Sequence, residues 1–194
     1  MLLLSKISFG FSQKKYFDDE NKEITEIEFN KTKIKQGQFK VCNDSLQKCK
    51  VVLNRSAEGT IDSELLINDL ERHLQLKLDK EIPTVIIFYP GKDRCNSSGT
   101  ATVESQYKAY KNREQLLDRF KMSNHLYIYK DSKNLKTIHK LNWYKDPQNI
   151  IENTFFEYRY PCNSYVIIYN NKYRSYFREF TQQQILNDQA EIIK

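Results

Sequence analysis

The sequence predicts an α/β protein with a mixed central sheet, preceded by a β-rich extension. From residue 84 onward, strand-like and helix-like segments follow one another in the order β α β α β β α. Residues 84–89 are apolar without alternation and rich in β-branched side chains, which is typical of a central strand covered on both faces. With 194 residues, 13% of them aromatic, the chain has enough bulky apolar surface to form a core.

The amino-terminal segment 1–13 differs in character from the rest of the chain. It is apolar and ends in small and polar residues, and the residues that follow it are strongly charged. We interpret it as a shortened export signal, with a mature chain that begins near residue 13; the alternative is a buried first strand. Export predicts a periplasmic or secreted protein, in which the four cysteines can form disulfides.

Residues 14–81 are predicted to form the extension, made of hairpin strands and one helix. Asp62 is placed to cap that helix, because leucines recur after it at helical spacing until the chain approaches Pro83. Turn residues separate the short strand-like segments. The predicted strands are 16–17, 25–29, 38–41 and 50–53.

Two cysteines flank the turn at 43–48 in this extension. Cys42 directly follows the predicted strand 38–41, and Cys49 directly precedes the predicted strand 50–53. We therefore expect a structural disulfide between them, which closes the hairpin loop and stabilises it by roughly 2 to 3 kcal/mol.

Residues 82–194 are predicted to form the main domain. Asn170-Asn171 predicts a hairpin turn, and Thr181 is placed to cap the last helix. The expected elements are strands at 84–89, 126–129, 164–169 and 172–177, and helices at 103–120, from Asp146-Pro147 toward 155–156, and at 182–193.

This domain resembles the thioredoxin fold, and in particular secreted thioredoxin-like thiol-disulfide oxidoreductases. The resemblance is carried by the strand 85–89, followed within six residues by Cys95, and by the block 163–173, which reads NSYVIIYNNKY. It covers residues 82–194 and implies a thioredoxin-like three-layer fold.

Two departures from the family bear on activity. The family carries CxxC after its first central strand, whereas Ser98 stands here at the position of the second cysteine. A CxxS site can form a mixed disulfide but cannot resolve it internally. The family's cis-proline aligns with Asn163 or, shifted by two positions, with Pro161.

Two functions remain open from these residues. In a thioredoxin-like sheet the loops that carry Cys95 and Cys162 lie at the same edge, so these cysteines form a candidate redox pair, with Lys92 and Arg94 favouring the Cys95 thiolate. The function we favour is a binding or structural module of the cell envelope with its cysteines locked as disulfides. The alternative is a thiol-disulfide oxidoreductase that uses Cys95 with Cys162 as its non-adjacent partner. The partner is accordingly an unknown protein or a thiol-disulfide substrate.

Composition and motifs exclude several other classes of function. The mean hydropathy of −0.73 and the lack of an apolar run near ~20 residues predict no membrane span. The formal charge of +6 is scattered along the chain, and no nucleic-acid-binding motif is present, so no nucleic acid is expected as a partner. The three histidines are isolated, and no CxxC or phosphate-binding glycine motif occurs, so we expect no metal and no cofactor.

Overall fold

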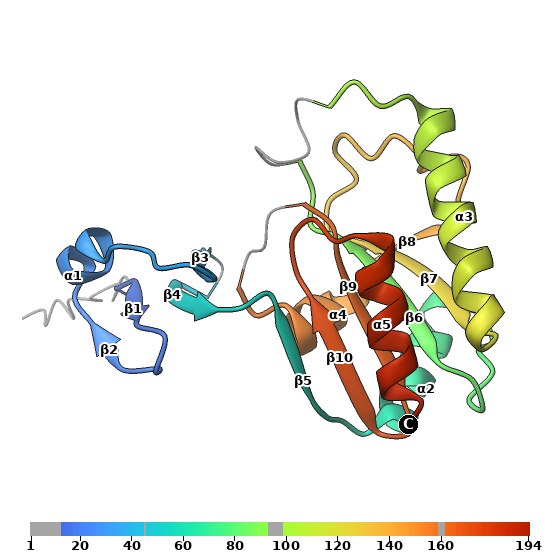
Figure 1. The fold of residues 1–194 in the computed structure, drawn as a ribbon, viewed down its shortest axis with the longest axis horizontal. Helices are drawn as coiled ribbons and strands as arrows, with labels where there is room; N and C mark the ends of the chain where they lie inside the picture. The colour runs from blue at the N-terminus through green and yellow to red at the C-terminus, as the bar shows by residue number, and fades with distance from the viewer. Residues whose placement is uncertain (1–12, 45, 93–98, 159–161) are drawn as a thin grey trace, which may run out of the picture. The chain divides into compact units, whose positions relative to one another are not determined.

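The chain forms two compact units, which we describe separately. The structure, a computed structural model, describes residues 13–44, 46–92, 99–158 and 162–194. One unit ends at Asn54 and the other comprises Arg55–Lys194 (Figure 1). The division therefore falls after residue 54 rather than at the expected boundary after residue 81. The reason is that residues 56–60 pair with the large sheet of the second unit, and the following helix packs on the same sheet.

The first unit is a four-stranded mixed sheet with one short helix. Its strands lie in the order β2-β1-β4-β3, with β1 parallel to β4 and the other pairs antiparallel. Phe29, Cys49 and Val51 form its buried apolar cluster, and the Tyr16 ring contacts Phe29 at 5.2 Å between centroids. The elements are β1 Lys15–Phe17, β2 Glu23–Ile24, α1 Glu26–Lys31, β3 Gln38–Asn43 and β4 Lys48–Leu53.

Helix α1 replaces the strand predicted at 25–29. The Glu28 N–H donates to Thr25 Oγ1, and the Thr25 N–H donates to Glu28 Oε2 at 2.8 Å, which makes a capping box. This reciprocal pair satisfies two donors that a helix start leaves open. The alternation of apolar and polar residues at 25–29 predicted a strand wrongly, because only Phe29 of this segment is buried.

The predicted hairpin and its disulfide are both present in the first unit. Cys42 and Cys49 lie directly opposite each other on β3 and β4 and are bonded, with their Cα atoms 4.0 Å apart. This separation is far below the ~7 Å beyond which a disulfide cannot form without backbone movement.

The second unit is built on a six-stranded mixed sheet in the order β5-β10-β9-β6-β7-β8. Strands β6, β7 and β8 are parallel to one another, and β9, β10 and β5 continue the sheet in antiparallel pairs. The elements are β5 Ser56–Thr60, α2 Ser63–Leu74, β6 Thr84–Tyr89, α3 Val103–Phe120, β7 Asn124–Tyr129, β8 Trp143–Lys145, the 3₁₀ turn η1 Pro147–Asn149, α4 Ile150–Phe155, β9 Ser164–Tyr169, β10 Lys172–Tyr176 and α5 Gln182–Ile192.

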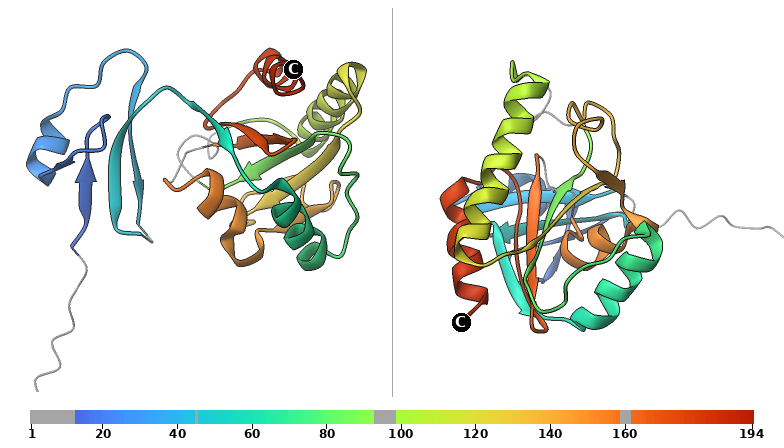
Figure 2. Two further views of the ribbon diagram at one scale, coloured as in Figure 1. Left: turned by 90° about the horizontal axis from the view of Figure 1, so that it is seen from below. Right: turned by 90° about the vertical axis from the view of Figure 1, so that its right-hand side faces the viewer.

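Helices cover both faces of this sheet, which gives three layers (Figure 2). Alternate residues of β6 point to opposite faces. Val85 and Ile87 pack with residues of α3 and α5, whereas Ile86 and Phe88 pack with residues of α2 and α4. All six residues of β6 are buried, so the prediction of a central strand covered on both faces is confirmed.

Two helices begin at the capping residues predicted for them. Asp62 accepts a hydrogen bond from the Leu65 N–H at 2.9 Å, and Thr181 accepts one from the Gln184 N–H at 3.1 Å. Thr102 caps α3 in the same way, although the sequence did not single it out. No helix in the described ranges is long and apolar enough to cross a membrane.

Candidate functional site

Cys162 is the one residue of the candidate redox pair that the structure describes. It is buried just before β9, its sulfur takes part in a disulfide, and its backbone has a φ of 65°, in the left-handed region that residues other than glycine seldom adopt. Lys92 is exposed and follows β6 by three positions. The other predicted site residues, Cys95, Arg94, Ser98 and Pro161, lie outside the described residues.

Asn163 connects the loop that carries Cys162 to helix α3. Its side-chain Nδ2 donates to the Tyr110 hydroxyl at 2.8 Å. Tyr110 is buried, and this burial raises its pKa, so the hydroxyl stays neutral. The sequence resemblance predicted that Asn163 or Pro161 stands where thioredoxin-like proteins have a cis-proline; no cis peptide bond occurs in the part of the chain that the structure describes.

Arg113, one turn further along α3, is a functional candidate that the sequence analysis missed. Its guanidinium lies between the rings of Tyr110 and Phe180, at 5.3 and 5.0 Å from their centroids. Its Nε and Nη1 are buried and have no hydrogen-bond partner among the described residues. Burial lowers the pKa of Arg113, since it disfavours the charged form. Its spacing from Leu117, four positions on along the same face, was the signal that could have indicated an inward-facing arginine.

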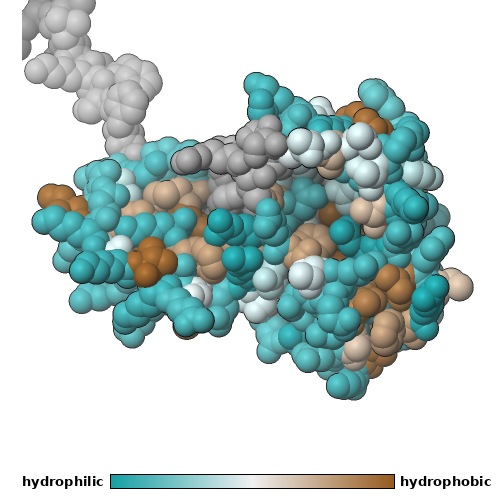
Figure 3. Space-filling view, turned by 45° about the horizontal axis from the view of Figure 1, so that its top comes forward, coloured by the Kyte–Doolittle hydropathy of each residue, from teal (hydrophilic) through white to brown (hydrophobic). Residues whose placement is uncertain are grey.

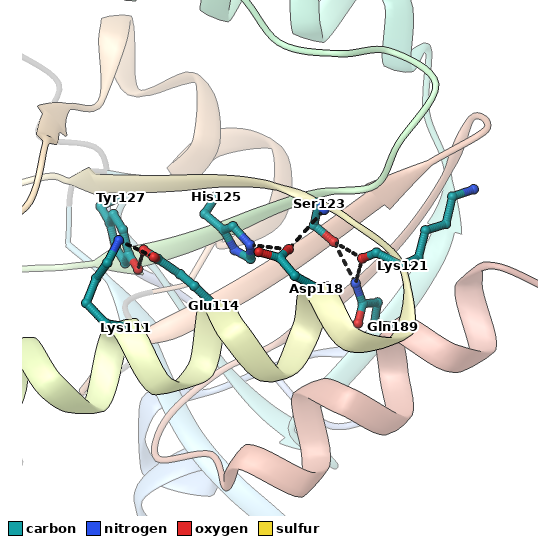
Figure 4. A network of polar contacts seen from close by, with 8 residues as sticks. All are labelled: Lys111, Glu114, Asp118, Lys121, Ser123, His125, Tyr127 and Gln189. Carbon is teal, nitrogen blue, oxygen red and sulfur yellow. Dashed lines mark hydrogen bonds and ion pairs between the residues drawn. The ribbon is translucent and has the colours of Figure 1, made fainter.

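A concave region lies between α3 and strand β7; we call it the α3–β7 pocket. It has a volume of about 490 Å³ and is lined by residues 76–78, 124–127 and 140–142 and by Tyr107, Lys111, Glu114 and Tyr144. These residues come from four separate segments of the chain. Figure 4 shows the polar contacts between α3 and β7 along this region.

Hydrogen bonds and ion pairs hold the wall of the pocket in place (Figure 4). The Tyr127 hydroxyl donates to Glu114, which also forms an ion pair with Lys111. Burial and the neighbouring Glu114 carboxylate raise the pKa of Tyr127, so its hydroxyl remains a donor. His125 Nε2 lies 2.8 Å from Asp118 Oδ1.

The end of α3 is fixed to α5 by a buried amide. Gln189 Nε2 donates to Ser123 Oγ at 2.6 Å and to the carbonyl oxygen of Lys121 at 3.1 Å. The Ser123 N–H in turn donates to Asp118 at 3.2 Å, beside His125 (Figure 4). The backbone that joins α3 to β7 at residues 121–123 is therefore held by buried hydrogen bonds to Gln189.

Neither a broad apolar interface nor a metal site is evident among the described residues. The face seen in Figure 3 is mostly hydrophilic, with apolar residues in small separate groups, so it does not indicate a broad apolar interface. Within the described ranges, no three His, Cys, Asp or Glu residues are arranged to hold a metal ion.

Comparison of the chain with protein-family models, curated proteins and solved structures finds no match.

Proposed function

We propose that the chain is a thioredoxin-like binding module of the cell envelope whose cysteines are held in disulfides. The order β10-β9-β6-β7, with β6 and β7 parallel and the other pairs antiparallel, supports the thioredoxin-like fold. The placement of α3 and α5 on one face and α4 on the other supports it as well. The sequence resemblance over residues 82–194 points in the same direction.

The observation that carries the functional part of the proposal is the state of Cys162. This residue is buried and disulfide-bonded, and Cys42 and Cys49 are bonded to each other, so none of the three cysteines in the described ranges is free. A buried disulfide stabilises a fold and is poorly placed to exchange with an external thiol. Disulfides persist in oxidising compartments, which supports a periplasmic or secreted location.

One feature favours the alternative, a thiol-disulfide oxidoreductase that uses Cys95 with Cys162. Cys162 has a left-handed backbone, and its neighbour Asn163 is hydrogen-bonded to Tyr110, which lies against Arg113, whose Nε and Nη1 have no hydrogen-bond partner among the described residues. Unusual backbone conformations and unpaired buried cations are enriched at functional sites.

A thiol count combined with peptide mapping separates the two functions. The full chain is produced in an oxidising compartment, denatured without reductant and treated with an alkylating agent. We expect no alkylated cysteine, a peptide linked through Cys162, and a reduction potential for that bond below about −300 mV. The Cys42→Ser/Cys49→Ser variant serves as the control, because it leaves Cys95 and Cys162 as the two cysteines that can give a signal. An alkylated Cys162 would contradict the locked disulfide, and catalytic turnover of a disulfide substrate that Cys162→Ser abolishes would establish the oxidoreductase instead.

A further inference from the structure

The α3–β7 pocket has the size and lining of a ligand site. Its volume of about 490 Å³ falls within the range of roughly 300–1,000 Å³ found for small-molecule sites. Two half-buried tyrosines, Tyr107 on α3 and Tyr144 on β8, contribute aromatic surface, whereas the ring of Tyr127 on β7 is buried against Tyr110 and Trp143. Leucine side chains from residues 76–78 and 126 complete the apolar part of the wall.

Every basic side chain that lines the pocket is paired with a carboxylate. Lys77 lies 3.4 Å from Glu71, and His125 lies 2.8 Å from Asp118. Two further pairs are Lys111 with Glu114 and Lys140 with Glu104. The wall therefore offers many hydrogen-bond donors and acceptors without an excess of either charge. Such a wall has no surplus charge that would select a charged ligand, and its paired groups fit an uncharged polar ligand.

The backbone of β7 adds a donor and an acceptor. Strand β8 pairs only with residues 127–129 of β7, so no strand within the described ranges lies beside residues 124–126 on that side. The Asn124 N–H donates to Pro83 on the β6 side, and alternate residues of a strand direct their backbone groups to opposite sides. The N–H and C=O of His125 are therefore directed toward the open edge.

The open edge is short, and its length bears on the class of ligand. Three residues of β7 lack a strand neighbour on that side, fewer than the ~5–6 of an ordinary strand, so addition of a peptide strand would gain few main-chain hydrogen bonds. A compact molecule with many hydroxyl groups meets the same backbone groups without needing a long edge. Each hydroxyl both donates and accepts, which suits a wall of paired ions and amides.

We infer that the α3–β7 pocket binds a neutral, hydroxyl-rich ligand of the oligosaccharide class. The tyrosine rings contact the apolar C–H faces of sugar rings, and the ion pairs and the backbone of His125 bond the hydroxyls. The inference gives a ligand to the proposed binding module and rests on that proposal only in taking the chain to bind rather than to catalyse.

Binding is tested on the full, disulfide-bonded chain labelled with ¹⁵N. Neutral hexasaccharides of glucose, mannose and N-acetylglucosamine are titrated in separate experiments, and backbone amide shifts are followed. At least one probe is expected to shift the amides of residues 124–127 and 140–144 in a saturable manner. Tyr144→Ala is expected to weaken binding at least tenfold, a change of about 1.4 kcal/mol.

A second variant and a matched control guard against loss of fold. Asn142 is exposed, and Asn142→Ala is expected to weaken binding about fivefold through one lost hydrogen bond. Tyr169→Ala removes a half-buried tyrosine that lies outside the α3–β7 pocket and is expected to leave affinity unchanged. The absence of saturable shifts with all three probes would overturn the inference, as would tighter binding of an acidic hexagalacturonate or of a neutral hexapeptide. The thiol map of the same sample reports separately on the proposed disulfide state.

Discussion

Removal of the Cys42–Cys49 bond should destabilise the first unit by an amount that the loop length sets. The two cysteines are separated by seven positions. In the chain-entropy model a closed loop of this size lowers the entropy of the unfolded chain by about 8 cal/mol/K, which corresponds to about 2.4 kcal/mol at 25 °C. The unit has a small core, built around the cluster of Phe29, Cys49 and Val51, so this is a large share of its stability.

Hydrogen exchange resolved by peptide is the suitable measurement for the Cys42→Ala/Cys49→Ala variant. Amides of β3 and β4 should lose protection by about 60-fold, the factor that corresponds to 2.4 kcal/mol. Peptides from the second unit provide the internal reference, and fluorescence of Trp143, the single tryptophan, checks that this unit stays folded. A loss of less than about threefold in β3 and β4, in a sample whose parent contains the bond, would refute the loop-entropy reasoning.

Three further predictions concern the second unit. Burial raises the pKa of the Asp146 carboxyl, so its stabilising contribution is present below the unfolded pKa of about 4 and is lost as pH rises through the folded pKa. In urea unfolding, the stability of the parent should therefore fall relative to that of Asp146→Asn as pH increases from about 4. A difference that stays constant with pH would contradict this. Tyr165→Phe removes the hydroxyl that donates to the buried Asp188 carboxylate, which should lower the free energy of unfolding by about 1–3 kcal/mol. The measurement is urea unfolding followed by tryptophan fluorescence, and a loss under about 0.5 kcal/mol would show that another donor replaces the hydroxyl. Gly91→Ala should lower the free energy of unfolding by about 1–3 kcal/mol in the same assay, because Gly91 has a φ of 115° and an added Cβ would lie 3.1 Å from Cβ of Asp131. An unchanged urea midpoint would show that the loop adjusts without strain.

The elements that the sequence predicted correctly are those with strong local signals. Strand β6 is a continuous apolar run, and helices α2 and α5 begin at the predicted capping residues Asp62 and Thr181. The strands missed by the prediction lack such signals. β5 has no residue with a large apolar side chain and is exposed along its whole length, and it forms because β10 supplies its hydrogen bonds. β8 has only three residues, too few for a period to be visible.

The candidate site was less predictable than the fold, because tertiary packing assembles it. Spacing in the sequence does not indicate that residues 76–78 and 140–142 approach β7, and these segments form half of the α3–β7 pocket. Arg113 lies in a polar helix in which charged residues are expected to face solvent, and its burial depends on Phe180 from the start of α5. The Cys42–Cys49 bond was predictable because both cysteines belong to one local hairpin.

The two edges of the six-stranded sheet differ in ways that bear on self-association. An exposed strand edge is a template for pairing with another chain, and long apolar edges are the most prone to growth into extended sheets. β8 offers an edge of three residues only, and β5 offers small and polar residues with Glu58 at their centre, where it pairs with Arg174. The β8 edge is thus protected against pairing with another chain because it is short, and the β5 edge because its residues are small or charged. At high concentration, lateral addition of chains to this sheet should therefore be slow, and replacement of Ala57 and Gly59 by β-branched apolar residues is the change that would promote it.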